Sequence, residues 1–249
     1  MSPKISVLMC VHNGMPYLEE SVQSVLNQDF KDFEFIVVEN CSTDRSFEFL
    51  SGIDDSRIKV FQTNLKQLSF NLNFGLSKCE APLIARMDAD DIAHKTRLAN
   101  QYKFFIENPE TVVLGTQTKL FNESGFTNIE RVPESNSSIR KNMPFRKVFL
   151  HPTVMFRRQD IMDVGGYLGG QYGQDFDLWL RLARNPELKF ANLPEAYLDY
   201  RVHSHQARGR KEAYALSAGY LFREFLLSGA FSYLAGSLTF AFKGLLWGR

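Results

Sequence analysis

Four short segments rich in apolar residues, each separated from the next by polar or helix-patterned residues, constrain the fold of this 249-residue chain most strongly. They cover residues 5–11, 33–38, 58–61 and 82–87. Short apolar segments of this kind are typical of strands buried in a sheet. Strands that alternate with helices form a parallel sheet with right-handed crossovers. We therefore expect an α/β fold with a mostly parallel central sheet flanked by helices.

Polar residues follow three of these predicted strands. Asn13 comes after the first, Glu39 closes the second, and Asp88-Ala89-Asp90-Asp91 follows the fourth. In parallel sheets, ligands bind beyond the carboxyl ends of the strands. The three polar clusters are therefore expected to share one ligand site on that edge of the sheet.

The segment Asp88–Asp91 places three carboxylates within four residues. Carboxylates this close repel one another, and a divalent cation would remove that cost. Aspartate oxygens suit Mg²⁺ or Mn²⁺. If strand geometry continues past Met87, Asp88 and Asp90 lie on one face, and Asp91 points away, where it can cap the next turn or helix. The alternative is a polar turn without a ligand.

The ordered segments Val7–Gly14, Ile36–Asp44 and Ala85–Asp91 resemble the family 2 glycosyltransferases, which have the GT-A fold, over the chain up to about residue 200. The resemblance implies that Glu39 contacts the nucleotide base, Asp88 the ribose side, and Asp90 the metal and diphosphate. The residues that it implies for binding the nucleotide sugar are Val11, Asn13, Glu39, Arg86, Asp88 and His151. The chain has Glu39-Asn40-Cys41-Ser42 where the family usually has Asp-Asp-Gly-Ser, and the longer Glu alters the depth of the base pocket.

The segment Gln174–Leu182 has apolar residues at helical spacing, and Asp175 falls in the first turn of this predicted helix. An acidic residue there can simply cap the helix and interact with its dipole. The segment also resembles the Glu-Asp motif of the family, in which the Asp is the catalytic base, although Gln174 replaces the usual Glu. Downstream, His203 and His205 are candidate metal ligands, and a solvent-exposed histidine pair is the alternative.

Two further segments have open interpretations. Residues 122–138 are polar and without periodicity, which predicts a surface loop or a mobile flap over the acceptor site. Arg97 lies near the start of a predicted helix, where it could reach a diphosphate. We expect it instead to be solvated or ion-paired, as arginines at such positions usually are.

The composition of the chain changes after residue 210. Residues 226–242 contain no charge, and these 17 positions are at the short end for a membrane span. Leu227, Phe231, Leu234, Leu238 and Phe242 would line one helical face. We therefore expect an amphipathic helical tail, 211–249, on a membrane surface or a partner. The rest, 1–210, is expected to be one GT-A domain with a nucleotide-binding half, 1–108, and an acceptor-binding half, 109–210.

The net charge and the cysteine content limit which binding partners and which cellular compartment we expect for this chain. The net charge is +1 and no long block of one sign occurs, which argues against nucleic acid as a partner. The three cysteines are odd in number and lack metal-ligand spacing, as expected for reduced thiols in the cytoplasm. No signal peptide is recognisable at the N-terminus. The expected location is the cytoplasm, with the tail on the inner face of the cell membrane.

The sequence thus predicts an inverting glycosyltransferase that uses Mn²⁺ or Mg²⁺, with inversion implied by the family. It would move a sugar from a nucleotide-diphosphate sugar, UDP-sugar favoured, to a hydroxyl of a glycan or lipid-linked acceptor. One alternative is a sugar nucleotidyltransferase, which should carry a glycine-rich, basic loop after its first strand. The loop 12–16 has one glycine and no lysine or arginine. Another alternative is a non-catalytic sugar-nucleotide or glycan-binding module, which would not turn over donor.

Overall fold

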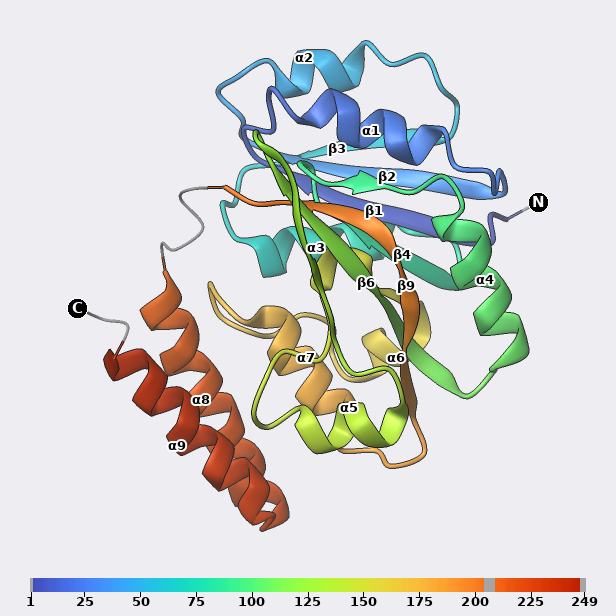
Figure 1. Cartoon of the computed structure of the whole chain (residues 1–249). Coiled ribbons are helices and arrows are strands. Elements are labelled where there is room, and N and C mark those ends of the chain that lie inside the picture. The colour runs from blue at the N-terminus through green and yellow to red at the C-terminus, as the bar shows by residue number, and fades with distance from the viewer. Residues whose placement is uncertain (1, 204–208, 247–249) are drawn as a thin grey trace.

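The computed structural model describes residues 2–203 and 209–246, in which one sheet separates two layers of helices (Figure 1). The strands are β1 Ile5–Val11, β2 Phe33–Asn40, β3 Ile58–Thr63, β4 Leu83–Met87, β5 Ile92–Ala93, β6 Thr111–Asn122, β7 Gly125–Glu130, β8 Met155–Arg157 and β9 Lys189–Arg201. The α-helices are α1 Leu18–Leu26, α2 Ser46–Ser51, α3 Leu68–Lys78, α4 Arg97–Glu107, α5 Asn136–Asn142, α6 Arg158–Asp163, α7 Gln174–Ala183, α8 Arg210–Ser228 and α9 Phe231–Leu246, and η1 His151–Thr153 is a 3₁₀ helix.

The strands pair in the order β3-β2-β1-β4-β8-β6-β9-β5. Strand β7 lies outside this order and pairs with β6. Strands β1 to β4 are parallel to one another, and Ile5 aligns with both Phe33 and Leu83. This confirms the predicted parallel sheet for the first half of the chain. In the second half β6 and β9 are parallel, whereas β5, β7 and β8 run antiparallel to their neighbours. Because β1, β2 and β4 end on the same edge, their polar C-terminal residues converge there.

Both faces of the sheet are covered, which explains the continuous apolar runs. Leu8 faces a core cluster shared with α3, α6 and α7, while Val7 and Met9 face a second cluster shared with α1 and α4. Helix α3 approaches β1 closely, because a Cβ at Gly75 would come within 2.3 Å of a Leu8 methyl group. This position therefore requires glycine for reasons of packing.

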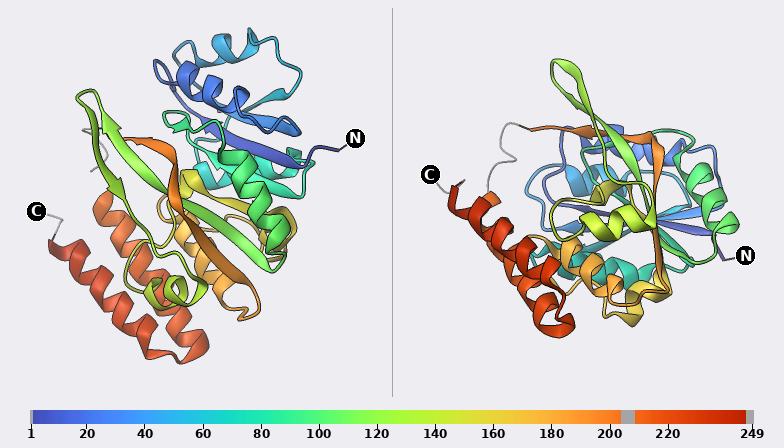
Figure 2. Two further views of the ribbon diagram at one scale, coloured as in Figure 1. Left: turned by 45° about the vertical axis from the view of Figure 1, so that its right-hand side comes forward. Right: turned by 60° about the horizontal axis from the view of Figure 1, so that its bottom comes forward.

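The segment 122–138 differs from its prediction. Strand β7 and the start of α5 occupy most of it, and β7 pairs antiparallel with β6. Local periodicity could not show this strand, because its residues are almost all exposed and only the pairing with β6 holds it. The β6–β7 hairpin projects beyond the body of the sheet (Figure 2).

Helices α8 and α9 form an antiparallel hairpin that packs beside α7 (Figure 2). Gly229, with φ +71°, ends α8, so the uncharged run 226–242 is divided between two helices. The expected single face is therefore wrong, since Leu227 lies in α8 and the other four residues lie in α9. Leu221 of α8 is completely buried in the same core cluster as α7, so the hairpin shares the core of the domain. None of the described helices is long and apolar enough to cross a membrane.

Candidate active site

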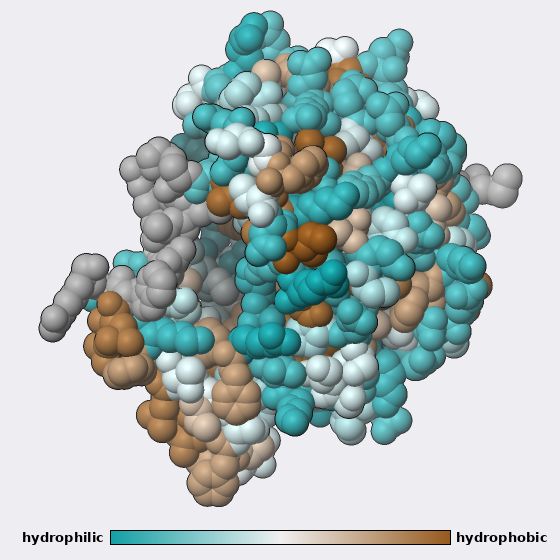
Figure 3. Space-filling view, viewed as in Figure 1, coloured by the Kyte–Doolittle hydropathy of each residue, from teal (hydrophilic) through white to brown (hydrophobic). Residues whose placement is uncertain are grey.

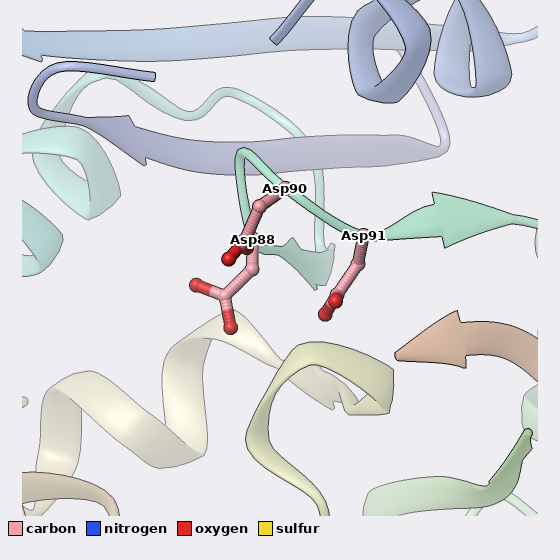
Figure 4. A group of neighbouring side chains, drawn as sticks. All are labelled: Asp88, Asp90 and Asp91. Carbon is pink, nitrogen blue, oxygen red and sulfur yellow. The ribbon is translucent and has the colours of Figure 1, made fainter. Parts of the chain in front are cut away.

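The three carboxylates after β4 lie together. Asp88, Asp90 and Asp91 each place one ligand oxygen within 4.8 Å of the others, and all three side chains leave one side of the β4–β5 loop (Figure 4). The strand ends at Met87, so side-chain alternation does not continue through the turn. The expectation that Asp91 points away and caps the next element is therefore wrong. Its Oδ1 accepts a hydrogen bond of 2.9 Å from the Arg201 backbone N–H.

The end of β9 holds this loop in place. The Arg201 guanidinium donates from Nε to the Asp90 carbonyl (2.9 Å) and stacks 4.2 Å from the Tyr17 ring centre. The next polar side chain, His203, contacts the carboxylate itself, with its Nε2 at 2.7 Å from Asp90 Oδ2. His203 was a candidate metal ligand, and its ring lies against the Asp cluster; His205, the other candidate, lies outside the described residues. The strand therefore reaches the Asp cluster from the other half of the chain.

The chemistry of the cluster fits a divalent cation. Burial, followed by repulsion from Asp88 and Asp90, raises the pKa of Asp91 to about 9. Burial also raises the pKa of Asp88, and Asp90 adds to that shift while Arg86 opposes it. Asp91 Oδ2 is buried and has no hydrogen-bond partner among the described residues. A hard cation bound by oxygen ligands would remove the repulsion and give this oxygen a partner. The sequence analysis did not propose Asp91 as a ligand.

Two buried arginines lie beneath the Asp cluster. Arg86, on β4, forms an ion pair with Asp88. Arg97, at the start of α4, is 2% exposed and donates from Nη2 to the Arg86 carbonyl (2.7 Å) and from Nε to Gln101 (3.1 Å). The expectation that Arg97 is solvated or ion-paired is therefore wrong. These hydrogen bonds make its guanidinium a structural donor in the core, where burial lowers the pKa of Arg97 to about 9.

A cavity of about 340 Å³ opens between β1 and the Asp cluster, and Asn13, Asp88, Asp90 and His203 line it. Asn13, with φ +53°, accepts a 2.7 Å hydrogen bond from the Thr43 N–H, which ties the loops after β1 and β2 together. Among the other residues that line it are His12, which the prediction did not include, and Cys10, Tyr17 and Ala89. The structure thus brings Asn13 and the carboxylates to one site.

Two residues predicted to bind the donor lie deeper. Val11 is 1% exposed and packs in the core, where it aligns with Glu39. Glu39 is also buried, and its two carboxylate oxygens accept from the Ser42 N–H (2.6 Å) and from Gln62 Nε2 (3.1 Å). Neither lines the cavities described here. For Glu39, a ligand would have to compete with these internal partners.

A second cavity, of about 460 Å³, runs from Arg86 and Asp88 to Asp175 at the start of α7. His151 also lines it, and the His151 Nε2 lies 3.0 Å from the Tyr167 hydroxyl. Burial, assisted by the Arg86 charge, lowers the pKa of His151 well below its usual range, so the ring is neutral. The structure therefore brings four residues predicted for the site, Arg86, Asp88, His151 and Asp175, to one cavity.

Two carboxylates in the first turn of α7 have different surroundings. Asp175 is half-buried at the cavity, and burial raises its pKa, while backbone hydrogen bonds and the Lys147 charge oppose the shift. Asp177 is 1% exposed and is held by Arg181 (2.8 Å) and by Arg223 of α8 (2.6 Å). Asp177 is therefore an anchor for the hairpin, whereas Asp175 faces the space where a substrate would bind.

Besides Asp91 and His12, the sequence analysis missed Lys147, Tyr200 and Arg201. Lys147 follows α5, and Tyr200 and Arg201 close β9. No local motif marks them, because the loop after α5 has no periodicity and β9 reaches the cluster only through its pairing with β5 and β6. The one available signal was the position of Tyr200 and Arg201 immediately before the candidate histidines.

Comparisons with known proteins agree with this geometry. A family model described as "Glycosyl transferase family 2" matches residues 6–165. The "O-antigen biosynthesis glycosyltransferase WbnJ" of Escherichia coli is 38% identical over 228 residues, which cover 89% of each chain. The E. coli "UDP-Gal:alpha-D-GlcNAc-diphosphoundecaprenol beta-1,3-galactosyltransferase" is 31% identical and covers 84% of this chain and 78% of that protein.

Two solved structures have the same fold. S. aureus TarS 1–349 in complex with UDP-GlcNAc superposes with a TM-score of 0.69 at 21% identity, covering 88% of this chain and 66% of that chain. The mannosyltransferase PcManGT from Pyrobaculum calidifontis, in complex with GDP-Man and Mn²⁺, gives 0.69 at 17% identity, with 99% and 75% covered. These likenesses confirm the predicted GT-A fold. Both the family match and the curated relatives point to a glycosyltransferase rather than to the two alternatives, a sugar nucleotidyltransferase or a binding module. This chain belongs to glycosyl transferase family 2.

Proposed function

We propose that this glycosyltransferase acts in surface-polysaccharide biosynthesis, as the names of its E. coli relatives suggest. It moves a sugar from a UDP-sugar to a hydroxyl of a glycan or lipid-linked acceptor, depends on a divalent cation, and inverts the sugar. One observation carries the proposal: a single cavity is lined by Arg86 and Asp88 at the Asp cluster and by Asp175 at the start of α7. Such a cavity can hold the reacting sugar between a nucleotide site and a base.

The donor would bind across the ends of β1, β2 and β4. Asn13 and Asp88, which line one cavity, would meet the nucleoside, and Glu39 is proposed for the base because of its position after Val38 in the family motif. Asp88, Asp90, Asp91 and His203 would hold Mn²⁺ or Mg²⁺. The cation would offset the charge that develops on the diphosphate as it leaves. Arg86 compensates the charge of Asp88 in the same region.

Asp175 would act as the general base. As the acceptor oxygen attacks the anomeric carbon, its proton passes to the Asp175 carboxylate, the bond from carbon to the diphosphate oxygen breaks, and the nucleoside diphosphate leaves. A single displacement of this kind inverts the sugar. Burial raises the pKa of Asp175, which brings a carboxylate nearer to the operating pH, as general-base catalysis requires. The neutral His151, fixed by Tyr167, would line the donor sugar without adding charge.

A set of exposed apolar residues on the hairpin suits a membrane-bound acceptor. Phe222, Leu226, Leu227, Phe231, Leu238, Phe242, Leu245 and Leu246 are each more than 40% exposed. Figure 3 shows hydrophobic residues gathered over the hairpin, in contrast to the polar surface of the sheet domain. Apolar side chains in such number commonly mark an interaction surface. We propose that this surface rests on the membrane in which a lipid-linked acceptor is anchored.

The test of the proposed function is release of UDP from a panel of UDP-hexoses, with and without Mn²⁺ and with a synthetic GlcNAc-diphosphate lipid as acceptor. We expect slow, Mn²⁺-dependent hydrolysis of one donor by water and faster release with acceptor. NMR of the product then gives the anomeric configuration. Retention of configuration, or full activity after EDTA treatment, would contradict the inverting, metal-dependent mechanism.

A further inference from the structure

A third cavity, of about 180 Å³, adjoins Asp175 on the side away from the Asp cluster. It shares Lys147, Phe149, Gly173 and Asp175 with the larger cavity, so the two spaces meet at the proposed base. The larger cavity reaches Asp88, whereas the smaller one extends between α7 and the α8–α9 hairpin. The mechanism described above uses only the larger cavity and leaves this space unassigned.

Aromatic side chains form most of the wall of the smaller cavity. Phe149, Phe176, Trp179 and Phe240 line it, and the Phe176 and Phe240 rings are stacked with centres 5.8 Å apart. Polar groups stand at its edge, where Asp175 and Lys147 meet the larger cavity, and Ser217 of α8 also contributes. Sites with apolar or aromatic walls and a few placed polar groups bind small ligands.

Trp179 adds a second observation. It is 2% exposed, and its Nε1–H has no hydrogen-bond acceptor among the described residues. An unpaired buried donor is costly, so a ligand oxygen that accepts this hydrogen bond would be favoured. The wall thus suits a molecule with apolar faces and polar edges.

We infer that the smaller cavity binds the pyranose ring of the acceptor that carries the reacting hydroxyl. This inference rests on the proposed function and gives its acceptor site a position and a chemistry. The C–H faces of the ring pack on the aromatic walls, and its hydroxyl reaches Asp175 where the cavities meet. The donor sugar approaches from the other side of Asp175. Because the volume is below the roughly 300 Å³ of drug-sized pockets, a single ring fits better than an oligosaccharide.

The inference assigns a role to the hairpin. Ser217 and Phe240 come from α8 and α9, so the acceptor site is complete only when the hairpin is docked on α7. Residues of the hairpin therefore contribute to acceptor specificity, although they are far in sequence from the β4–β5 loop that carries the Asp cluster. Phe242 offers a matched control, because it is also a phenylalanine of α9 but is 60% exposed and does not line the cavity.

The test uses saturation-transfer NMR on the full chain with saturating UDP and Mg²⁺, because paramagnetic Mn²⁺ would broaden the ligand signals. The probes are the methyl glycosides of glucose, galactose, mannose and N-acetylglucosamine. Three variants are compared with the parent: Phe240→Ala removes one wall, Ser217→Met fills the cavity, and Phe242→Ala is the control. We expect at least one glycoside to receive saturation in the parent and in Phe242→Ala. Its signal should fall about tenfold in the other two variants, while the UDP signal remains in all four proteins.

The outcomes separate this inference from the proposed function. If UDP binds but no glycoside receives saturation in the parent, the cavity is not a pyranose site. Equal glycoside signals in the parent and in Ser217→Met also overturn the inference, because the Met side chain should occupy the cavity and exclude the ring. Met adds only buried apolar atoms at this position, so we expect the variant to stay folded. A parent that does not bind UDP overturns the proposed function instead. Melting temperatures within a few degrees of the parent confirm that each variant is folded.

Discussion

The two carboxylates in the first turn of α7 allow a sharp test, because they have different surroundings and we propose different roles for them. The perturbation is the same at both positions, Asp175→Asn and Asp177→Asn, which keeps size and hydrogen-bonding capacity and removes the charge. Asp175 faces the cavity, and no ion pair involves it among the described residues. Asp177 joins Arg181 of its own helix to Arg223 of the hairpin.

The expected magnitudes follow from these surroundings. Asp175→Asn removes the proton acceptor, which is typically worth about 10² to 10⁴ in rate. It should not destabilise the fold, because burial already disfavours the charged form. Asp177→Asn leaves the Arg181 guanidinium, 7% exposed, without its counter-ion. Breaking a buried pair costs about 3–5 kcal/mol, and we expect about 2–4 kcal/mol here because Arg223 is 36% exposed. The melting temperature should fall by about 5–15 °C.

The assay measures melting temperature by scanning fluorimetry and donor transfer at a temperature well below the lowest melting point. Asp175→Asn should melt like the parent, bind UDP and Mn²⁺ normally, and lose transfer. Asp177→Asn should melt early and retain most of its transfer rate while folded. The reasoning is refuted if the folded Asp177→Asn protein is the inactive one, or if Asp175→Asn transfers sugar at a near-parental rate. In that case Asp175 only stabilises the helix N-terminus.

Three further predictions concern the metal, the pH dependence and the hairpin. Asp90→Ala and Asp91→Asn should each weaken Mn²⁺ binding by about tenfold or more in calorimetry, and unchanged affinity would remove that residue from the site. A general base must be deprotonated, and burial raises the pKa of Asp175. We therefore expect kcat/KM to be lost as the pH falls through a value above about 3.9, the ordinary pKa of an aspartate. Because the Lys147 charge lowers the pKa of Asp175, Lys147→Met should shift this loss of kcat/KM to a higher pH. Replacing Leu226, Leu227 and Phe231 with serine should reduce co-flotation with liposomes without changing donor hydrolysis, and a parent that does not float would assign the apolar surface to a protein partner.

The parallel half of the fold could be predicted from the sequence because β1, β2 and β4 are almost completely buried and each is followed by polar residues. Leu8, Ile36 and Ile84 lie in the same core cluster, as apolar runs of this kind indicate. The second half could not be predicted in this way. Strand β7 is exposed along its length, and its existence depends on pairing with β6, which no local pattern encodes.

In the candidate site, too, some residues could be predicted from the local sequence and others could not. Asp88 and Asp90 stand out because they are crowded in sequence and follow a buried strand. Asp91 was misplaced because the alternation of a strand was extended through a turn that begins after Met87. Arg97 was misjudged because its burial depends on a carbonyl of β4, a contact between elements. Contacts between distant segments, such as Arg201 with the Asp90 carbonyl, leave no local mark in the sequence.

The ion pair between Asp177 and Arg223 has a mechanical consequence. Helix α7 cannot turn about its axis without separating these two side chains, which lie 46 positions apart along the chain. Asp175 stands two residues before Asp177, so the proposed base and this contact with the hairpin belong to the same first turn of α7. Undocking the whole hairpin would free this turn of helix, whereas Asp177→Asn removes one charge and leaves the hairpin held by its buried apolar contacts, such as Leu221. Substitutions that undock the hairpin should therefore reduce transfer as well as stability, even though they lie at the periphery of the molecule.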